Sequence, residues 1–449
     1  MGVAIETLLA DRVDDHLADL AYHYSRSPNV PKAAKYLCLA GRQAAGRAAH
    51  PEALEYFGDG LKTLEGLPAG PHRVELELPL QIGFGFSLRA TKGFTAPEVE
   101  RTLSRARDLC SQSSNTAQLF NVLVGLHTFY LYRSPGTSGA LARELLSVAE
   151  ALGESAKIAT GYLAMGETAM YLGDFQPSRQ YLERTIALAS SHRADQQNAR
   201  GYLAVTLWCL GYSNQASERM QEALELAQDK NRPLRAVNIL AYSCALNAQM
   251  RLWQSSKQQA EAGMSLAEQY GFNFHAHWFA VVHGRALMEN EHAVQGIAEI
   301  RRGIEGLDAL GGTQAFVLGY FGEGCLKIEM AGAGLQALAR AMRLSEETSE
   351  RWQSSELYRL KGELLLRRDE INVAEAQMCF ESAIEVARRQ SAKSWELRAT
   401  TSLARLLARQ GRRNDALEML GDIYDWFTEG FDTADLKDAK ALLDELNKN

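Results

Sequence analysis

Three histidines lie close together in the segment NFHAHWFAVVH, residues 273–283. A helix binds a metal ion most readily through side chains four residues apart, because these share one face. His275, His277 and His283 are separated by two and six residues, so their rings point in different directions, and no His-Glu-x-x-His motif occurs. We therefore expect no metal site here, and histidines that are half-buried or line a groove.

The segment AGAGLQA, residues 331–337, has the outline of a dinucleotide-binding fingerprint, Gly332-x-Gly334-x-x-Ala337. That fingerprint binds a nucleotide only when a strand precedes the first glycine within a βαβ unit. Residues 313–330 instead have the pattern of a long helix. We expect the glycines to cap one helix and turn the chain into the next, and we predict no nucleotide or other cofactor.

Nucleophile and phosphate-binding motifs are also missing from the sequence. GTSGA at 136–140 lacks the Gly-x-Ser-x-Gly pattern, and no Gly-x-x-x-x-Gly-Lys-Ser/Thr or even Gly-Lys dipeptide occurs. Adjacent carboxylates such as Glu346 and Glu347 fall on a predicted solvated helix face. No combination of nucleophile, base and oxyanion donors can be recognised, so we predict that the protein is not an enzyme.

Composition limits the class and location of the protein. The net charge of −7 gives no reason to expect nucleic-acid binding. The six cysteines are widely scattered without a Cys-x-x-Cys pair, which favours buried, reduced thiols. No run of 18 apolar residues occurs, and acidic residues come too early for a secretory signal. We expect a cytoplasmic protein without membrane contact.

The elements that carry these segments repeat along the chain. In GYLAMGETAMYLGDFQPSRQYLERTIALA, residues 161–189, two helical patterns flank a turn at Gly173-Asp174. The first has an aromatic residue, then Met-Gly and Ala at helical spacing, and the second has a small, a large and a small residue. This spacing resembles a tetratricopeptide repeat, in which small residues let two helices approach closely.

The same pattern recurs about ten times, with a period of roughly 36–46 residues. Further second-helix triplets are Ala53/Phe57/Gly60, Ala216/Met220/Ala223, Ala293/Ile297/Ile300, Gly334/Leu338/Ala341, Ala376/Phe380/Ala383 and Ala416/Leu420/Ile423. We predict an all-α, right-handed superhelical solenoid of about ten such helix pairs with a C-terminal capping helix. The apolar faces of each pair should be covered only by the adjacent pairs.

The two ends differ from the array between them. We expect a lead-in helix in residues 1–30, the repeat array in 31–430 and a capping helix in 431–449. Thr433 is the expected N-cap of that last helix, with Asp435 in its first turn. No comparable cap is evident at the N-terminus, so that end should be partly open and favour weak self-association.

Three stretches resemble a particular family more closely. They are LADLAYHYSRSPNVPKAAKYLCLAGRQA (17–44), LYRLKGELLL with AKSWELRATTSLARL (357–366 and 392–406) and YDWFTEGFDTADLKDAKALLDEL (424–446). Together they resemble the C-terminal tetratricopeptide region of bacterial signalling proteins that combine an adenylate or guanylate cyclase domain with a STAND-type ATPase. The resemblance implies a sensor arm, with ATPase or cyclase domains in cis or in trans. Because this sequence lacks the phosphate-binding loop, those activities do not carry over.

In a stack of helix pairs, the first helices line the concave surface, and the repeat register predicts which side chains point into it. Arg398, Arg405 and Arg409 should share one face of a helix. They are either ordinary solvated arginines or part of a groove for an acidic or carboxylate-bearing peptide. The other predicted groove residues are His127, Trp208, His275, Trp278, Arg285, Lys327 and Arg359, with Tyr171, Asn238, Gln249 and Arg367.

The sequence thus predicts a non-catalytic scaffold or sensor that binds a protein or peptide in its concave groove. The alternative is a small-molecule sensor of the kind found in STAND-type regulators, in which Trp208, Trp278 and His275 would stack on a sugar or nucleobase. An enzyme with an unrecognised site is the third class of function.

Overall fold

The computed structural model of the chain describes residues 2–113, 115–188, 193–227, 232–289, 292–369 and 372–448. Within these ranges the regular elements are helices, no strand occurs, and ten helix pairs follow one another. Their first helices are α3 (Val30–Gly46), α5 (Pro71–Lys92), α7 (Thr116–Arg133), α9 (Ser155–Leu172), α11 (Arg193–Leu210), α13 (Pro233–Gln249), α15 (Asn273–Leu287), α17 (Ala315–Lys327), α19 (Ser354–Arg368) and α21 (Lys393–Arg409). Their second helices are α4 (His50–Thr63), α6 (Pro97–Ser113), α8 (Pro135–Leu152), α10 (Phe175–Leu188), α12 (Ser213–Leu226), α14 (Trp253–Tyr270), α16 (Ala293–Ala309), α18 (Ala331–Thr348), α20 (Val373–Arg389) and α22 (Arg413–Asp425).

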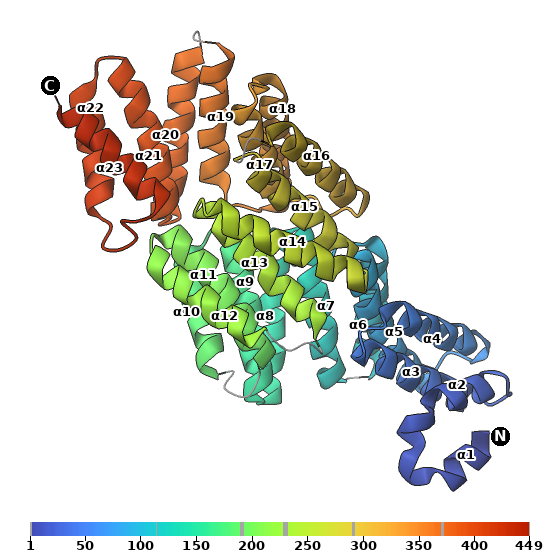
Figure 1. Ribbon diagram of the computed structural model, residues 1–449. Helices are drawn as coiled ribbons and strands as arrows, with labels where there is room; N and C mark the ends of the chain where they lie inside the picture. Colours follow the sequence, from blue (N-terminus) through green and yellow to red (C-terminus); the bar gives the residue numbers. More distant parts are fainter. Residues whose placement is uncertain are drawn as a thin grey trace.

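The array forms a superhelical solenoid with the two termini at opposite ends of the molecule (Figure 1). The short elements α1 (Gly2–Leu8), η1 (Ala10–His16) and α2 (Leu17–Ser25) precede it, η2 (Leu64–Gly66) follows α4, and α23 (Ala434–Asn447) closes the C-terminal end. No helix in the described part of the chain is long and apolar enough to cross a membrane.

Small residues let the two helices of a pair approach closely, as the repeat pattern predicts. A Cβ atom added to Gly166 of α9 would lie 2.7 Å from Leu182 of α10, and one added to Gly322 of α17 would lie 2.8 Å from Leu338 of α18. The same contact recurs at Gly41–Phe57 and Gly362–Phe380. The turn predicted at Gly173 is also present, with that glycine in the left-handed conformation that ends α9.

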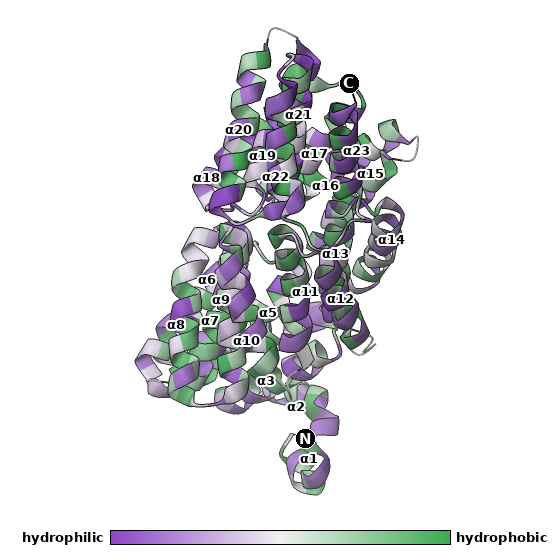
Figure 2. Ribbon diagram, turned by 90° about the vertical axis from the view of Figure 1, so that its left-hand side faces the viewer, coloured by the Kyte–Doolittle hydropathy of each residue, from purple (hydrophilic) through white to green (hydrophobic). Residues whose placement is uncertain are grey.

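Each pair is amphipathic, and stacking of the pairs buries the apolar faces. The helices carry both hydrophobic and hydrophilic residues, as the green and purple segments of Figure 2 show. The large side chains at the crossings, such as Phe57, Leu182, Leu338 and Phe380, are completely buried. Packing between neighbouring pairs therefore extends along the chain rather than around one central core.

The superhelix also brings distant pairs into contact, which the sequence analysis did not predict. Trp208 of α11 packs edge-on against Trp395 of α21, with ring centroids 4.7 Å apart, and Ser394 donates a hydrogen bond to the Trp208 carbonyl. The backbone N–H of Arg351 donates to the Tyr171 carbonyl at 2.7 Å. The expectation that adjacent pairs alone cover the apolar faces is therefore wrong, since α21 covers part of α11.

The expected role of the glycines in AGAGLQA is also wrong in detail. α18 begins at Ala331, so Gly332 and Gly334 lie within its first turn, and Glu329 turns the corner with a φ of 57°. Position 334 has no room for a larger residue, because a Cβ atom added to Gly334 would lie 2.9 Å from Cys325 and 2.8 Å from Leu364. A helix and not a strand precedes this segment, as predicted.

The two ends of the array are covered by helices. α23 packs on α21 and α22, and Thr433 occupies the N-cap position of α23 but donates its hydroxyl hydrogen to the Gly430 carbonyl instead of capping. At the N-terminus, Glu6 of α1 accepts hydrogen bonds from Tyr24 and Lys32. These bonds fold α1 back onto α2 and α3, although Val3 and Leu8 remain largely exposed.

Candidate functional site

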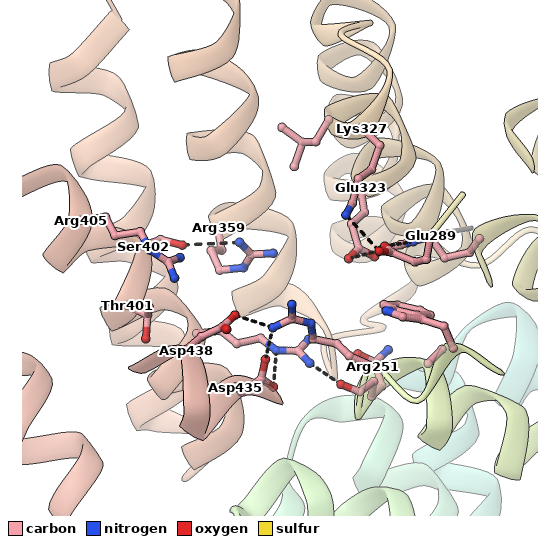
Figure 3. Close-up of a pocket in the computed structure, with 16 residues that line it drawn as sticks. Arg251, Glu289, Glu323, Lys327, Arg359, Thr401, Ser402, Arg405, Asp435 and Asp438 are labelled. Carbon is pink, nitrogen blue, oxygen red and sulfur yellow. Dashed lines mark hydrogen bonds and ion pairs between the residues drawn. The ribbon is translucent and has the colours of Figure 1, made fainter. Parts of the chain in front are cut away.

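A cleft of about 240 Å³ opens on the concave side where the C-terminal pairs meet the middle of the array (Figure 3). We call it the charged cleft. Its walls come from α13, α14, α15, α17, α19, α21 and α23 and from the turn before α14. The charged side chains that line it are Arg251, Arg285, Glu289, Glu323, Lys327, Arg359, Arg398, Arg405, Asp435 and Asp438. Arg251 belongs to the turn before α14, and Asp435 and Asp438 belong to α23. The other charged side chains come from the first helices of the pairs or from the residues just after them.

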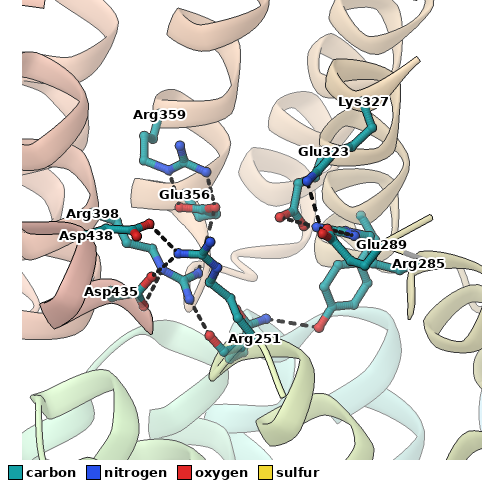
Figure 4. A network of polar contacts seen from close by, with 12 residues as sticks. Arg251, Arg285, Glu289, Glu323, Lys327, Glu356, Arg359, Arg398, Asp435 and Asp438 are labelled. Atoms are coloured by element: carbon teal, nitrogen blue, oxygen red, sulfur yellow. Dashed lines mark hydrogen bonds and ion pairs between the residues drawn. The ribbon is translucent and has the colours of Figure 1, made fainter. Parts of the chain in front are cut away.

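One half of the charged cleft is organised around Arg285, whose side chain is 1% exposed. Its guanidinium donates two hydrogen bonds to Glu323, at 2.8 and 2.6 Å, and one to Glu289 at 2.7 Å. The guanidinium also lies 4.2 Å from the centre of the Trp253 ring, a cation–π contact. Lys327 donates to the second oxygen of Glu289 at 3.0 Å (Figure 4).

These contacts fix the charges of the group. Burial alone would raise the pKa of Glu323, but the adjacent Arg285 guanidinium lowers it to about 2. Burial also tends to raise the pKa of Glu289, but Arg285 again lowers it below its ordinary value. Both carboxylates are therefore ionised near neutral pH and cannot act as proton donors. The group is an ion-pair network rather than an acid–base pair.

The other half of the charged cleft joins α19, α21 and α23. Arg359 donates two hydrogen bonds to Glu356, at 2.8 and 2.7 Å, and Arg398 donates to Asp435 at 2.8 Å. Arg251 reaches Asp438 at 2.6 Å (Figure 4). These pairs leave the cleft close to electroneutral, although its lining contains more basic than acidic side chains.

Arg398 links this half to the closure contact between α11 and α21. Its guanidinium lies 5.1 Å from the ring centres of both Trp208 and Trp395, and it donates a hydrogen bond to the Gln249 carbonyl. The side chains of Trp208 and Trp395 are almost completely buried. Trp208, predicted to line a groove, is therefore part of the junction beneath the cleft.

The predicted arginines of α21 are separated by the structure. Arg398 and Arg405 both line the charged cleft, whereas Arg409 lies on the exposed end of α21 outside it. Arg405 is exposed and has no ion pair with any described carboxylate, and Lys327 remains half-exposed at 48%. These two cations are the basic groups most accessible to a bound molecule.

The other predicted residues line two further cavities. His275 and Trp278 lie in an aromatic cavity of about 60 Å³, together with Tyr171 and Asn238. His127 lines an adjoining polar cavity of about 170 Å³. The repeat register therefore placed His275, Trp278 and His127 on the concave side, but in different cavities from the arginines.

The three histidines of 273–283 have three separate environments. His275 is hydrogen-bonded to Asn238 at 2.8 Å, and burial lowers its pKa to about 3. His283 contacts Glu299 at 3.0 Å, and His277 packs against Gly306. No group of three or more metal-ligating side chains occurs in the described ranges.

The polar cavity contains residues that sequence reasoning missed, namely Arg89 and Glu167. Both lie in apolar helical segments, GFSLRATKGF and LAMGETAMYL, at positions that face the interior of the superhelix. A charged residue within such a segment was the available signal, because charge on a buried face is costly unless it has a partner.

Comparison with known proteins gives a fold and no family. No family model matches the sequence, and neither does any curated protein. The structure is similar to that of a Rap protein complexed with competence and sporulation factor, with 10% sequence identity, a TM-score of 0.54, and coverage of 87% of this chain and 99% of that one. It is also similar to the human IFIT1 dimer with m7Gppp-AAAA (13% identity, TM-score 0.48, 97% and 96% coverage) and to yeast Tom70 (13%, 0.40, 97% and 96%). At 10% identity, the likeness to the Rap structure shows a tetratricopeptide-like helical-repeat fold and nothing further.

Proposed function

We propose that this chain is a non-catalytic scaffold that binds a protein or peptide on its concave face, with the charged cleft as the contact site. The observation that carries the proposal is that charged side chains of both signs, from several helices and a turn, line one open cleft. Such a surface recognises an extended segment through polar contacts along its length. The similar Rap structure, which is a complex with a factor, supports a binding role for this fold.

The accessible cations favour a partner segment that carries a carboxylate. Most basic groups of the cleft are already paired within the protein, but Arg405 is unpaired and Lys327 is half-exposed. A bound carboxylate would pair with Arg405 without breaking an existing ion pair. We therefore propose an acidic segment that enters from the side of α21.

The cellular setting is also a proposal. The resemblance of segments 17–44 and 424–446 to sensor arms supports a bacterial signalling role, with an ATPase or cyclase partner in cis or in trans. The six cysteines are free and buried, which supports a reducing, cytoplasmic location. The exposed Val3 and Leu8 of α1 support weak self-association through the N-terminal end.

Arg405 and Arg409 provide a matched test of the charged cleft. Both are exposed on α21, but only Arg405 lines the cleft. A random heptapeptide library displayed on phage is panned against the full chain, and the enriched peptides are synthesised and titrated. We expect Arg405→Glu to weaken their binding by about tenfold or more, and Arg409→Glu to leave it nearly unchanged. Equal effects of the two variants, or no effect of Arg405→Glu, would show that the cleft is not the contact site.

A second candidate function, a small-molecule sensor, is supported by the aromatic cavity. Phe94 stacks on Tyr132 with ring centroids 4.8 Å apart, and His275 meets Phe94 edge-on at 5.3 Å. A ligand at 100 times its dissociation constant would stabilise the protein by about 2.7 kcal/mol, which a thermal-shift measurement detects.

A further inference from the structure

The polar cavity and the aromatic cavity adjoin each other inside the superhelix. Both are lined by Phe94, Tyr132, Tyr202, Asn238 and Tyr242, so the two cavities meet at these side chains. The residues of α5, α7, α9, α11 and α13 that form the polar cavity are distinct from those of the charged cleft. The site is therefore independent of the proposed protein contact.

Arg89 is the unusual group of the polar cavity. Its Nε atom is buried and makes no hydrogen bond. No carboxylate of the described residues lies within ion-pair distance of its guanidinium, which instead lies 4.8 Å and 5.7 Å from the ring centres of Phe86 and Phe94. Arg89 as a whole is partly buried. Because a guanidinium in such a position is normally paired, Arg89 has an unused capacity to bind an anion.

The neighbouring acid does not neutralise Arg89. Burial raises the pKa of Glu167 to about 8, with a smaller contribution from Asp195, so the Glu167 carboxyl is largely protonated at neutral pH. Burial also lowers the pKa of His127 to about 4, which leaves its ring neutral. The 4.0 Å approach of His127 to Glu167 is therefore not an ion pair at neutral pH.

Neutral hydrogen-bonding groups surround the cation. The Tyr132 hydroxyl lies 3.3 Å from that of Tyr202 and 3.5 Å from that of Tyr242, both long for hydroxyl–hydroxyl bonds. The three hydroxyls therefore lie close together, and all three tyrosines line both cavities. They can turn towards a bound oxygen at little cost.

We infer that the joined cavities bind a small organic monocarboxylate, with its carboxylate on Arg89 and its apolar end among the aromatic rings. A bidentate guanidinium–carboxylate pair is among the strongest polar contacts available to a protein. A dianion such as phosphate is disfavoured, because Arg89 is the only cation among the described residues that line the polar cavity and Asp195 also lines it. The small volume of the aromatic cavity limits the apolar end to about one ring or a branched chain.

A free acid and the C-terminus of a peptide both carry such a carboxylate, and the experiment separates the two sources. Full-length protein is titrated by calorimetry with phenylacetate, phenylacetamide, inorganic phosphate, and a tripeptide ending in phenylalanine with a free or an amidated C-terminus. We expect binding of phenylacetate or the free-acid tripeptide, and binding of the matching amide weaker by about tenfold or more. Binding of phenylacetate alone identifies a free acid, and binding of the tripeptide alone identifies a peptide end.

Two variants on α5 connect binding to Arg89. Arg89→Met removes the cation but keeps an apolar side chain of similar length, and Lys92→Met removes an exposed cation three residues away. We expect Arg89→Met to weaken binding by about tenfold or more and Lys92→Met to leave it unchanged. Arg405→Glu, the charged-cleft variant, should also leave it unchanged, which separates this inference from the proposed function.

The pH dependence provides a readout that does not require the Arg89 variant to fold. Affinity should fall as pH rises through about 8, because Glu167 then gains a charge that repels the bound anion. Glu167→Gln should abolish that fall. The other ionisable groups that act on Glu167 are Arg89, His127, Tyr132, Tyr171, Asp195, Tyr202 and Tyr242.

The inference is overturned if neither carboxylate probe binds, if acid and amide bind equally well, or if folded Arg89→Met binds as tightly as the native protein. Tight binding of inorganic phosphate would instead indicate a general anion site and would also contradict the assignment.

Discussion

Replacing Arg285 with alanine tests whether the ion-pair network holds α15 and α17 together. Arg285→Ala leaves Glu323 and Glu289 without their buried partner, and the largest cost falls on Glu323. Its pKa of about 2, against an ordinary value of 4.5, corresponds to about 3 kcal/mol at neutral pH, since one pKa unit is about 1.4 kcal/mol. Loss of one partner from a buried ion pair typically costs about 3–5 kcal/mol, which agrees.

Hydrogen exchange is the appropriate assay, because it reports the stability of α15 and α17 themselves when a repeat array unfolds locally. A loss of about 3 kcal/mol lowers the protection of amides in α15 and α17 by roughly a hundredfold. Arg302→Ala is the control, because Arg302 is 74% exposed and lies 3.6 Å from Glu299, a surface pair worth about 0–1 kcal/mol. Arg285→Ala/Glu323→Gln should recover part of the loss, since no uncompensated charge remains on Glu323.

The pH dependence has a definite sign. The pKa of Glu323 is lower in the folded than in the unfolded chain, so its stabilisation is complete above about pH 4.5 and is lost as pH falls towards 2. The difference between native protein and Arg285→Ala should shrink over the same range. A loss of protection no greater than that of Arg302→Ala at neutral pH would refute this account of the network.

Three other positions give predictions that thermal unfolding can check. Gly284→Ala should lower the unfolding temperature, with a cost of about 1–3 kcal/mol, because its Cβ would lie 2.6 Å from the Gly296 carbonyl where α15 crosses α16. Gly421 lies in the interior of α22, and no atom lies within 4 Å of a Cβ added there. Gly421→Ala should therefore raise the unfolding temperature, with a gain of about 0.5–1 kcal/mol in the free energy of unfolding. A lower unfolding temperature in both variants would contradict the explanation from the helix crossing. Glu350 accepts hydrogen bonds from the Ala315 N–H at 2.8 Å and from the Trp352 indole at 3.2 Å. Glu350→Ala should therefore destabilise the start of α17 by about 1–3 kcal/mol for each donor left without an acceptor. An unchanged unfolding temperature in that variant would show that water replaces the carboxylate.

The helix pairs were predictable from the sequence because their determinants are local. Gly166 and Leu182 show where two helices cross, and Gly173 shows where the chain turns. Each of these features depends on residues within one pair. The same register placed His275 and Arg285 on the inner helices, where the structure has them.

The closure contact and the pairing of charges were not predicted, for different physical reasons. The contact of Trp208 with Trp395 depends on small rotations that accumulate over five pairs, which no local pattern encodes. The pairing of charges could have been recognised in the sequence, because Arg285 and Glu323 are 38 residues apart, which is about one repeat. Opposite charges at the same position of successive first helices should have indicated an ion pair instead of a free cation.

The contact between α11 and α21 affects how the molecule responds to force. An open array behaves as a spring, whose curvature changes in proportion to the load. Here the Trp208–Trp395 contact and the hydrogen bond from Ser394 tie two points of the coil together. A change in curvature between these two points first has to separate the indole rings. We therefore expect the superhelix to change in one step between two states, one with the rings in contact and one with them apart.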